Sequence, residues 1–201
     1  MDNSTSPASY STTPNAIFLP ICAALVTLAT YVPLLLLVRV KKVAACTLVI
    51  TLAVQNVFTF LNAILWPNNN TTEWYNGVGL CDVQVTIKVP LSTLLATSAA
   101  YISRDLAKAL DADNPNLHES RKMRRRRLAV EILFVFGIPI LQVVLHYIPQ
   151  ASRFGVVTIY GCADFLDDSW PALVILAIWP PIFALLNCYY AGKSYNTCSL
   201  A

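Results

Sequence analysis

The chain has 201 residues, of which 56% are hydrophobic and only 12% are charged, with a formal net charge of +3. An average soluble domain carries roughly 25% charged residues, so this composition is unlike that of a typical soluble protein. A large soluble core could still hold this many apolar residues, and their arrangement along the chain decides the class.

Five apolar segments are long enough to cross a membrane as helices. Residues 16–38 and 43–65 contain no Asp, Glu, Lys or Arg, and each makes a helix of roughly 34 Å at about 1.5 Å per residue. Because a hydrocarbon core is about 30 Å thick, both segments can span it. Segments 83–103, 128–148 and 170–191 also reach spanning length. We therefore expect an all-α, polytopic transmembrane helix bundle with five spans.

The first apolar segment is interpreted as a membrane helix rather than a signal peptide. It has no basic region before it and is longer than the apolar core of a typical signal. On this reading residues 1–15 form an extracellular N-terminal segment. Residues 16–191 form the five-helix membrane region, and residues 192–201 form a short cytoplasmic tail.

Basic residues predict the orientation of the spans. Of the 14 Lys and Arg residues, 12 fall in the links after spans one and three or follow span five. Basic residues stay on the cytoplasmic side, so the N-terminus is expected outside. Glycosylation sequons support the same topology, because all of them fall in segments that it places outside: Asn3, Asn69 and Asn70.

The basic run 121–127 has two interpretations. Such a run can bind nucleic acid, but no aromatic side chain is interleaved within it to stack on bases. It directly precedes span four, where basic residues fix orientation and meet anionic lipid headgroups. We therefore expect membrane lipids as partners and no nucleic acid.

Ionisable residues inside the spans are the first candidates for function. Lys88 lies about two turns below Cys81 in span three, and a charge at this depth usually faces the bundle interior or a wet cavity. The alternative is that its long stem extends to the interface. Glu131 is expected to form a local ion pair, and His146 to lie at the membrane interface.

Two cysteines fall in segments predicted to face an oxidising compartment. Cys81 begins span three and Cys162 lies in the second long outer loop, so they either form a disulfide or remain free thiols. The last four residues, from Cys198 to Ala201, fit a prenylation box, although such a short pattern also arises by chance.

No constellation typical of an enzyme is present in the sequence. The two histidines, His118 and His146, are predicted on opposite membrane faces and cannot share a metal ion. The chain has no glycine-rich phosphate loop, nucleophile elbow or metal-ligand cluster. We expect no enzymatic activity, no metal and no cofactor.

Several short motifs, taken together and in order, resemble one family, the fungal mating-pheromone receptors of the a-factor receptor type. They run from about residue 16 to residue 191: Asn62 to Pro67, Cys81-Asp82 with Lys88, Ser103 to Leu106, Leu145-His146-Tyr147, Gln150 with Arg153-Phe154, Gly161-Cys162, and Trp179-Pro180-Pro181.

The resemblance implies a seven-helix, G-protein-coupled receptor in the plasma membrane, of which five helices are present, so a truncated or incomplete form is expected. It implies as partners a lipidated peptide pheromone, a heterotrimeric G protein and a second receptor copy. The implied ligand contacts are Lys88, Asp82, His146, Arg153 and Phe154. The implied G-protein-facing residues are Arg104, Asp105, Arg124 and Arg125.

Two other functions remain open from the sequence. The proline-bearing helices and Lys88 would also suit a small membrane transporter or channel, although the expected repeat between halves is not convincing. The chain could alternatively be a non-signalling accessory protein of a full-length receptor.

Overall fold

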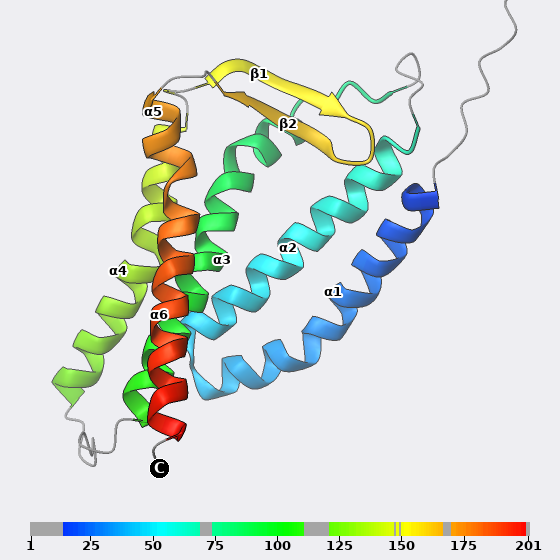
Figure 1. The fold of residues 1–201 in the computed structure, drawn as a ribbon. Coiled ribbons are helices and arrows are strands. Elements are labelled where there is room, and N and C mark those ends of the chain that lie inside the picture. The colour runs from blue at the N-terminus through cyan, green and yellow to red at the C-terminus, as the bar shows by residue number, and fades with distance from the viewer. Residues whose placement is uncertain are drawn as a thin grey trace, which may run out of the picture.

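The computed structural model describes residues 14–68, 74–110, 121–146, 148, 150–166 and 170–199. It is a bundle of long helices with a small two-stranded sheet at one end (Figure 1). The elements in chain order are α1 (Pro14–Val40), α2 (Val43–Leu65), α3 (Leu80–Leu110), α4 (Arg121–Leu145), β1 (Gln150–Val157), β2 (Gly161–Leu166), α5 (Trp170–Ala172), a π-helical turn (Leu173–Ala177) and α6 (Trp179–Ser199). The expected all-α membrane bundle is confirmed.

The helices are long and apolar enough to cross a membrane. In the described part of the chain four helices meet this requirement singly, and the bent pair 170–177 and 179–199 adds a fifth span. Large apolar side chains face outward, as lipid requires and water disfavours, for example Phe18 and Leu28 of α1, which are 66% and 72% exposed. The chain is a multi-pass membrane protein.

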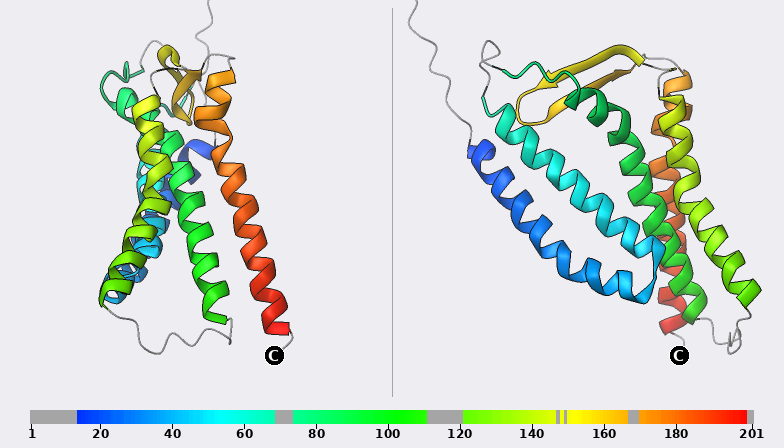
Figure 2. Two further views of the ribbon diagram at one scale, coloured as in Figure 1. Left: turned by 90° about the vertical axis from the view of Figure 1, so that its left-hand side faces the viewer. Right: turned by 180° about the vertical axis from the view of Figure 1, so that it is seen from behind.

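Helix α3 is the centre of the bundle. It packs against α2, α4 and α6, whereas α1 packs mainly against α2 at the edge (Figure 2). At 31 residues α3 is about 46 Å long, so it extends beyond a hydrocarbon core of about 30 Å. The buried positions of α3 include the small polar residues Thr93, Thr97 and Ser98, which allow close helix approach.

The last span is broken rather than continuous. Pro180 and Pro181 have no backbone N–H, so the carbonyls one turn before them lose their helical partners. The chain responds with a π-helical turn, in which the Ile178 N–H bonds the Leu173 carbonyl at 3.0 Å, and with a bend of 42°. The amide of Gln142 on α4 then donates to the freed Leu176 carbonyl at 3.2 Å. A neighbouring helix thus stabilises the break.

Candidate functional site

The two ends of the bundle have different chemistry and are described in turn. The hairpin end comprises β1, β2 and the adjoining ends of α2 and α3 (residues 62–66 and 74–88). The basic end comprises residues 39–44 and the ends of α3 and α4 (residues 101–110 and 121–131). Residue 14 begins α1 near the hairpin end, and residue 199 ends α6 at the basic end (Figure 1).

An antiparallel hairpin of β1 and β2 crosses the ends of α2 and α3 (Figures 1 and 2). Its turn places Ile159 and Gly161 at positive φ, 66° and 76°. Glycine is needed at position 161 for a second reason, because a β-carbon there would collide with the side chain of Asn62. The sequence did not predict these strands within the second outer loop.

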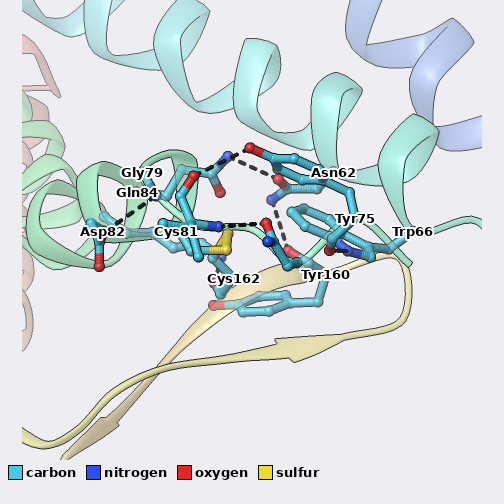
Figure 3. Close-up of a disulfide and its surroundings, with 12 residues drawn as sticks. Asn62, Trp66, Tyr75, Gly79, Cys81, Asp82, Gln84, Tyr160 and Cys162 are labelled. Atoms are coloured by element: carbon cyan, nitrogen blue, oxygen red, sulfur yellow. Dashed lines mark hydrogen bonds between the residues drawn. A yellow bond between two sulfur atoms is a disulfide. The ribbon is translucent and has the colours of Figure 1, made fainter. Parts of the chain in front are cut away.

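A disulfide holds the hairpin to α3. Cys81 and Cys162 are bonded with an S–S distance of 2.08 Å, and both residues are fully buried (Figure 3). They form an apolar cluster with Trp66 and Val85, against which Phe154 packs. Of the two alternatives that the sequence left open, the disulfide is present, and it joins the second outer loop to the start of α3.

Hydrogen bonds hold the turn of the hairpin to α2. The Asn62 amide donates to the Tyr160 carbonyl at 2.8 Å and accepts from the Gln84 amide of α3 at 2.9 Å (Figure 3). The Ile159 N–H donates to the Trp66 carbonyl at 2.9 Å. Because these bonds join α2, α3 and the turn, the hairpin has a fixed position over the helices.

Lys88 of α3 contacts the same turn. Its ammonium donates to the Cys162 carbonyl at 3.1 Å and lies 3.4 Å from the centre of the Tyr160 ring. The carboxylate of Asp164 on β2 attracts this ammonium and also acts electrostatically on His146. Lys88 is half-buried, and its ammonium faces the hairpin rather than a neighbouring helix.

The other predicted ligand-contact residues lie in different surroundings at the hairpin end. Asp82 accepts a hydrogen bond from the Gly79 N–H at 3.2 Å, in the first turn of α3. His146 follows the last residue of α4 and is fully buried within the protein, so its position at the membrane interface stays a prediction. Phe154 lies in the disulfide cluster. Arg153 belongs to β1, and its side chain is outside what the structure describes.

The remaining predicted sites lie elsewhere. The four predicted G-protein-facing residues all belong to the basic end, Arg104 and Asp105 on α3 and the exposed pair Arg124 and Arg125 on α4. Cys198 is an exposed free thiol in the last turn of α6. The three glycosylation sequons fall outside the described residues: Asn3, Asn69 and Asn70.

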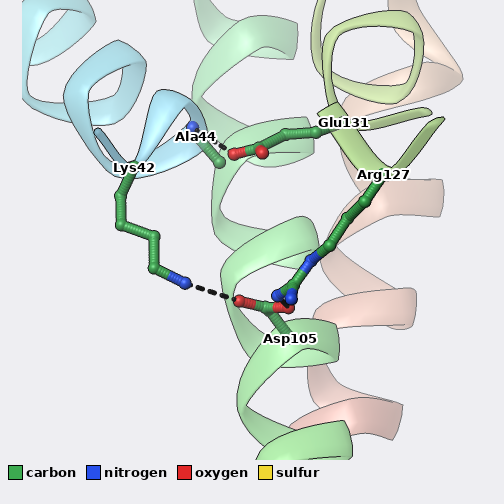
Figure 4. Close-up of polar contacts among 5 residues, drawn as sticks. All are labelled: Lys42, Ala44, Asp105, Arg127 and Glu131. Atoms are coloured by element: carbon green, nitrogen blue, oxygen red, sulfur yellow. Dashed lines mark hydrogen bonds and ion pairs between the residues drawn. The ribbon is translucent and has the colours of Figure 1, made fainter. Parts of the chain in front are cut away.

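At the basic end, Asp105 of α3 joins two other elements. It pairs with Lys42 at 3.1 Å and with Arg127 of α4 (Figure 4). Glu131 accepts from the Ala44 N–H at 2.9 Å and so satisfies a donor in the first turn of α2. The ion pair expected for Glu131 is replaced by this bond, because the open helix end is a nearer donor than the arginines preceding it.

Comparisons with known proteins identify the family of the chain. A family model of pheromone A receptors matches residues 18–199. The chain belongs to this family. Pheromone receptor 1 of Ustilago hordei is 25% identical over 79% of the chain and 43% of its own length. The pheromone a factor receptor of Saccharomyces cerevisiae is 23% identical over 75% of the chain and 32% of its own length.

A third relative, the pheromone B beta 1 receptor of Schizophyllum commune, is 26% identical over 77% of the chain and 28% of its own length. The chain therefore spans less than half the length of these relatives. No solved structure matches it significantly. The family is a class of receptors, not of enzymes, and among the described residues no cluster of His, Cys, Asp and Glu could hold a metal ion.

Sequence reasoning missed several residues of the hairpin end. Tyr160, Gln84 and Asp164 all contact or act on predicted residues, yet each lies in a segment without a distinctive pattern. The adjacent pair Gly161-Cys162 was the available signal, because a glycine beside a bridged cysteine indicates a tight turn at the bridge.

Proposed function

We propose that the chain acts as a mating-pheromone receptor in the plasma membrane, with the hairpin end outside the cell. It binds a C-terminally lipidated peptide at the hairpin end and engages a heterotrimeric G protein at the basic end. The observation that carries this proposal is the match of the pheromone A receptor family over residues 18–199. The concentration of basic residues at the opposite end supports the orientation.

The hairpin end offers chemistry suited to a lipidated peptide. Tyr160 and Phe165 expose 55% and 52% of their surface on the hairpin, and Ile148 exposes 65% just before it. These three exposed side chains offer apolar contacts at the hairpin end, which a peptide with a lipid tail needs. Lys88 and Asp164 supply opposite charges next to it, which fix the orientation of a peptide.

The basic end offers a surface for the G protein. Arg124 and Arg125 are exposed in the first turns of α4. Arg104 lies one residue before Asp105, whose ion pairs tie α3 to α4 and to the start of α2. An acidic or polar partner surface can therefore meet several positive charges on a fixed framework.

The ligand proposal is tested with the full chain in nanodiscs. The probe is the lipidated peptide fraction secreted by compatible mating cells, and the same fraction with its lipid removed is the reference. We expect saturable binding of the lipidated fraction, weakened at least tenfold in Lys88→Gln. The matched control Lys193→Gln removes one charge at the other end and should bind normally. Equal binding of both fractions would contradict the proposal.

The G-protein proposal is tested by recovery of a purified heterotrimer on the same nanodiscs. The double variant Arg124→Gln with Arg125→Gln should recover less, whereas Arg121→Gln with Lys122→Gln, an equal charge change on the same helix, should recover a normal amount. Recovery that depends only on the number of charges removed would argue against a specific surface.

A further inference from the structure

A cleft of about 630 Å³ lies between α3 and α4 at the basic end. This volume falls within the range of roughly 300–1,000 Å³ that small-molecule sites occupy. Residues of α3 and α4 line its walls, and Lys42 at the start of α2 reaches its edge. Because α3 and α4 both continue past their apolar segments here, the cleft lies at the level of the lipid headgroups.

The cleft is lined by five cations and one carboxylate. The cations are Lys42, Arg104, Lys108, Arg126 and Arg127, and the carboxylate is Asp105. Asp105 pairs with Lys42 and Arg127, which fixes these two side chains within the wall. Within the described part of the chain no ion pair involves the other three cations, so the cleft carries a surplus of positive charge.

The lining of the cleft also includes apolar side chains, with Ala109 and Met123 nearest the ends of α3 and α4. Two lining residues lie on the side toward the membrane interior. Tyr101 is about one turn before Asp105 on α3, and Val130 is about one turn after Arg126 on α4. Val130 exposes 43% of its surface there. The cleft therefore brings cations and apolar side chains together, and a lipid needs both, for its headgroup and for its acyl chains.

We propose that this cleft binds a membrane lipid whose headgroup carries a phosphate monoester. Such a group brings two or more negative charges and no cation, so it matches the surplus charge of the cleft. Phosphatidylserine and phosphatidylethanolamine bring an ammonium that the five cations would repel. Arg104 and Arg126 suit phosphate oxygens because a guanidinium can donate two parallel hydrogen bonds to them. Basic pockets between membrane helices are known to take such headgroups.

This site goes beyond the proposed function, since it concerns the opposite end of the molecule from the peptide ligand. It also does not require a G protein. The receptor proposal and the lipid proposal can therefore fail independently.

The test uses the full chain in phosphatidylcholine nanodiscs doped with a fluorescent phosphatidylinositol bisphosphate. We expect saturable binding that is at least tenfold weaker in Lys108→Gln with Arg126→Gln, since each basic residue near a lipid surface contributes about fivefold. The control Arg121→Gln with Lys122→Gln removes the same charges from the adjoining turn of α4, outside the cleft, and should bind normally. Helix content measured by circular dichroism should be equal in all variants.

Three results would overturn the proposal. Equal weakening in both double variants would show attraction to diffuse surface charge, and no weakening in either would place the lipid elsewhere. Equal binding of phosphatidylserine would remove the requirement for a phosphate monoester. A soluble inositol bisphosphate is added in a further arm. If this soluble compound displaces the fluorescent lipid at an equal concentration, the cleft takes a free phosphate compound and not specifically a membrane lipid.

Discussion

The contact of Lys88 with the hairpin gives the most specific prediction. The ammonium makes one charge-assisted hydrogen bond to the Cys162 carbonyl and one cation–π contact with Tyr160. A hydrogen bond to a charged group contributes about 1.5–3 kcal/mol, and a cation–π contact about 0.5–2 kcal/mol. Lys88→Met removes both contacts but also relieves the cost of a half-buried charge, so we expect the hairpin to lose about 1–2 kcal/mol of local stability.

The pairwise contribution can be isolated with a double-mutant cycle. Lys88→Met and Tyr160→Leu are made singly and together in the full chain in nanodiscs, and hydrogen exchange is followed at the backbone amides of residues 156–163. A loss of about 1.4 kcal/mol appears as a tenfold faster exchange. We expect a coupling energy of about 0.5–2 kcal/mol between the two positions.

A matched control replaces a distant tyrosine. Tyr195 of α6 is 74% exposed and far from the hairpin in sequence, so Tyr195→Leu should not couple to Lys88→Met. Additive effects of the Lys88 and Tyr160 substitutions, within about 0.3 kcal/mol, would refute a stabilising contact between the two side chains.

Three further predictions concern the framework of the site. The disulfide joins cysteines 81 residues apart, so replacing both Cys81 and Cys162 by alanine should lower the free energy of unfolding by at most about 4.5 kcal/mol. Hydrogen exchange should accelerate far more in the hairpin than in α3. Gln142→Leu deprives the Leu176 carbonyl of its donor and should cost about 1–3 kcal/mol in thermal unfolding in detergent; an unchanged midpoint would contradict this role. Gly161→Ala adds a β-carbon at positive φ against a buried amide and should lower the yield of disulfide-bonded chain, seen as a mobility shift on reduction.

The membrane bundle was predictable because a hydrocarbon core sets a simple length requirement. Segment 43–65 coincides with α2, whereas the charges that end the apolar part of α3 do not end the helix itself, which runs from Leu80 to Leu110. Charges mark where a helix leaves lipid, but backbone hydrogen bonding continues in the headgroup region and beyond. The sequence therefore predicts spans better than helix ends.

The contacts that connect distant segments were less predictable. Asn62 bonds Gln84 of the neighbouring helix and a carbonyl of the hairpin turn, and the second partner depends on a sheet that has no membrane-length signal. Glu131 was assigned to neighbouring arginines because sequence proximity is visible, whereas the open end of α2 is not. The sequence analysis gave segment 170–191 as one span; the break before Pro180 and its compensating donor, Gln142, depend on helix packing.

The central claim is that the hairpin end receives a lipidated peptide. It is tested most directly by photo-cross-linking, with a photoreactive amino acid placed at Phe165 on the hairpin or, for comparison, at Tyr195 at the basic end; both side chains are exposed. The probe is the lipidated peptide fraction secreted by compatible mating cells. We predict cross-linking at position 165 that excess unlabelled lipidated fraction removes, and none at position 195. Cross-linking at position 195 alone, or equal labelling of both positions, would contradict the account.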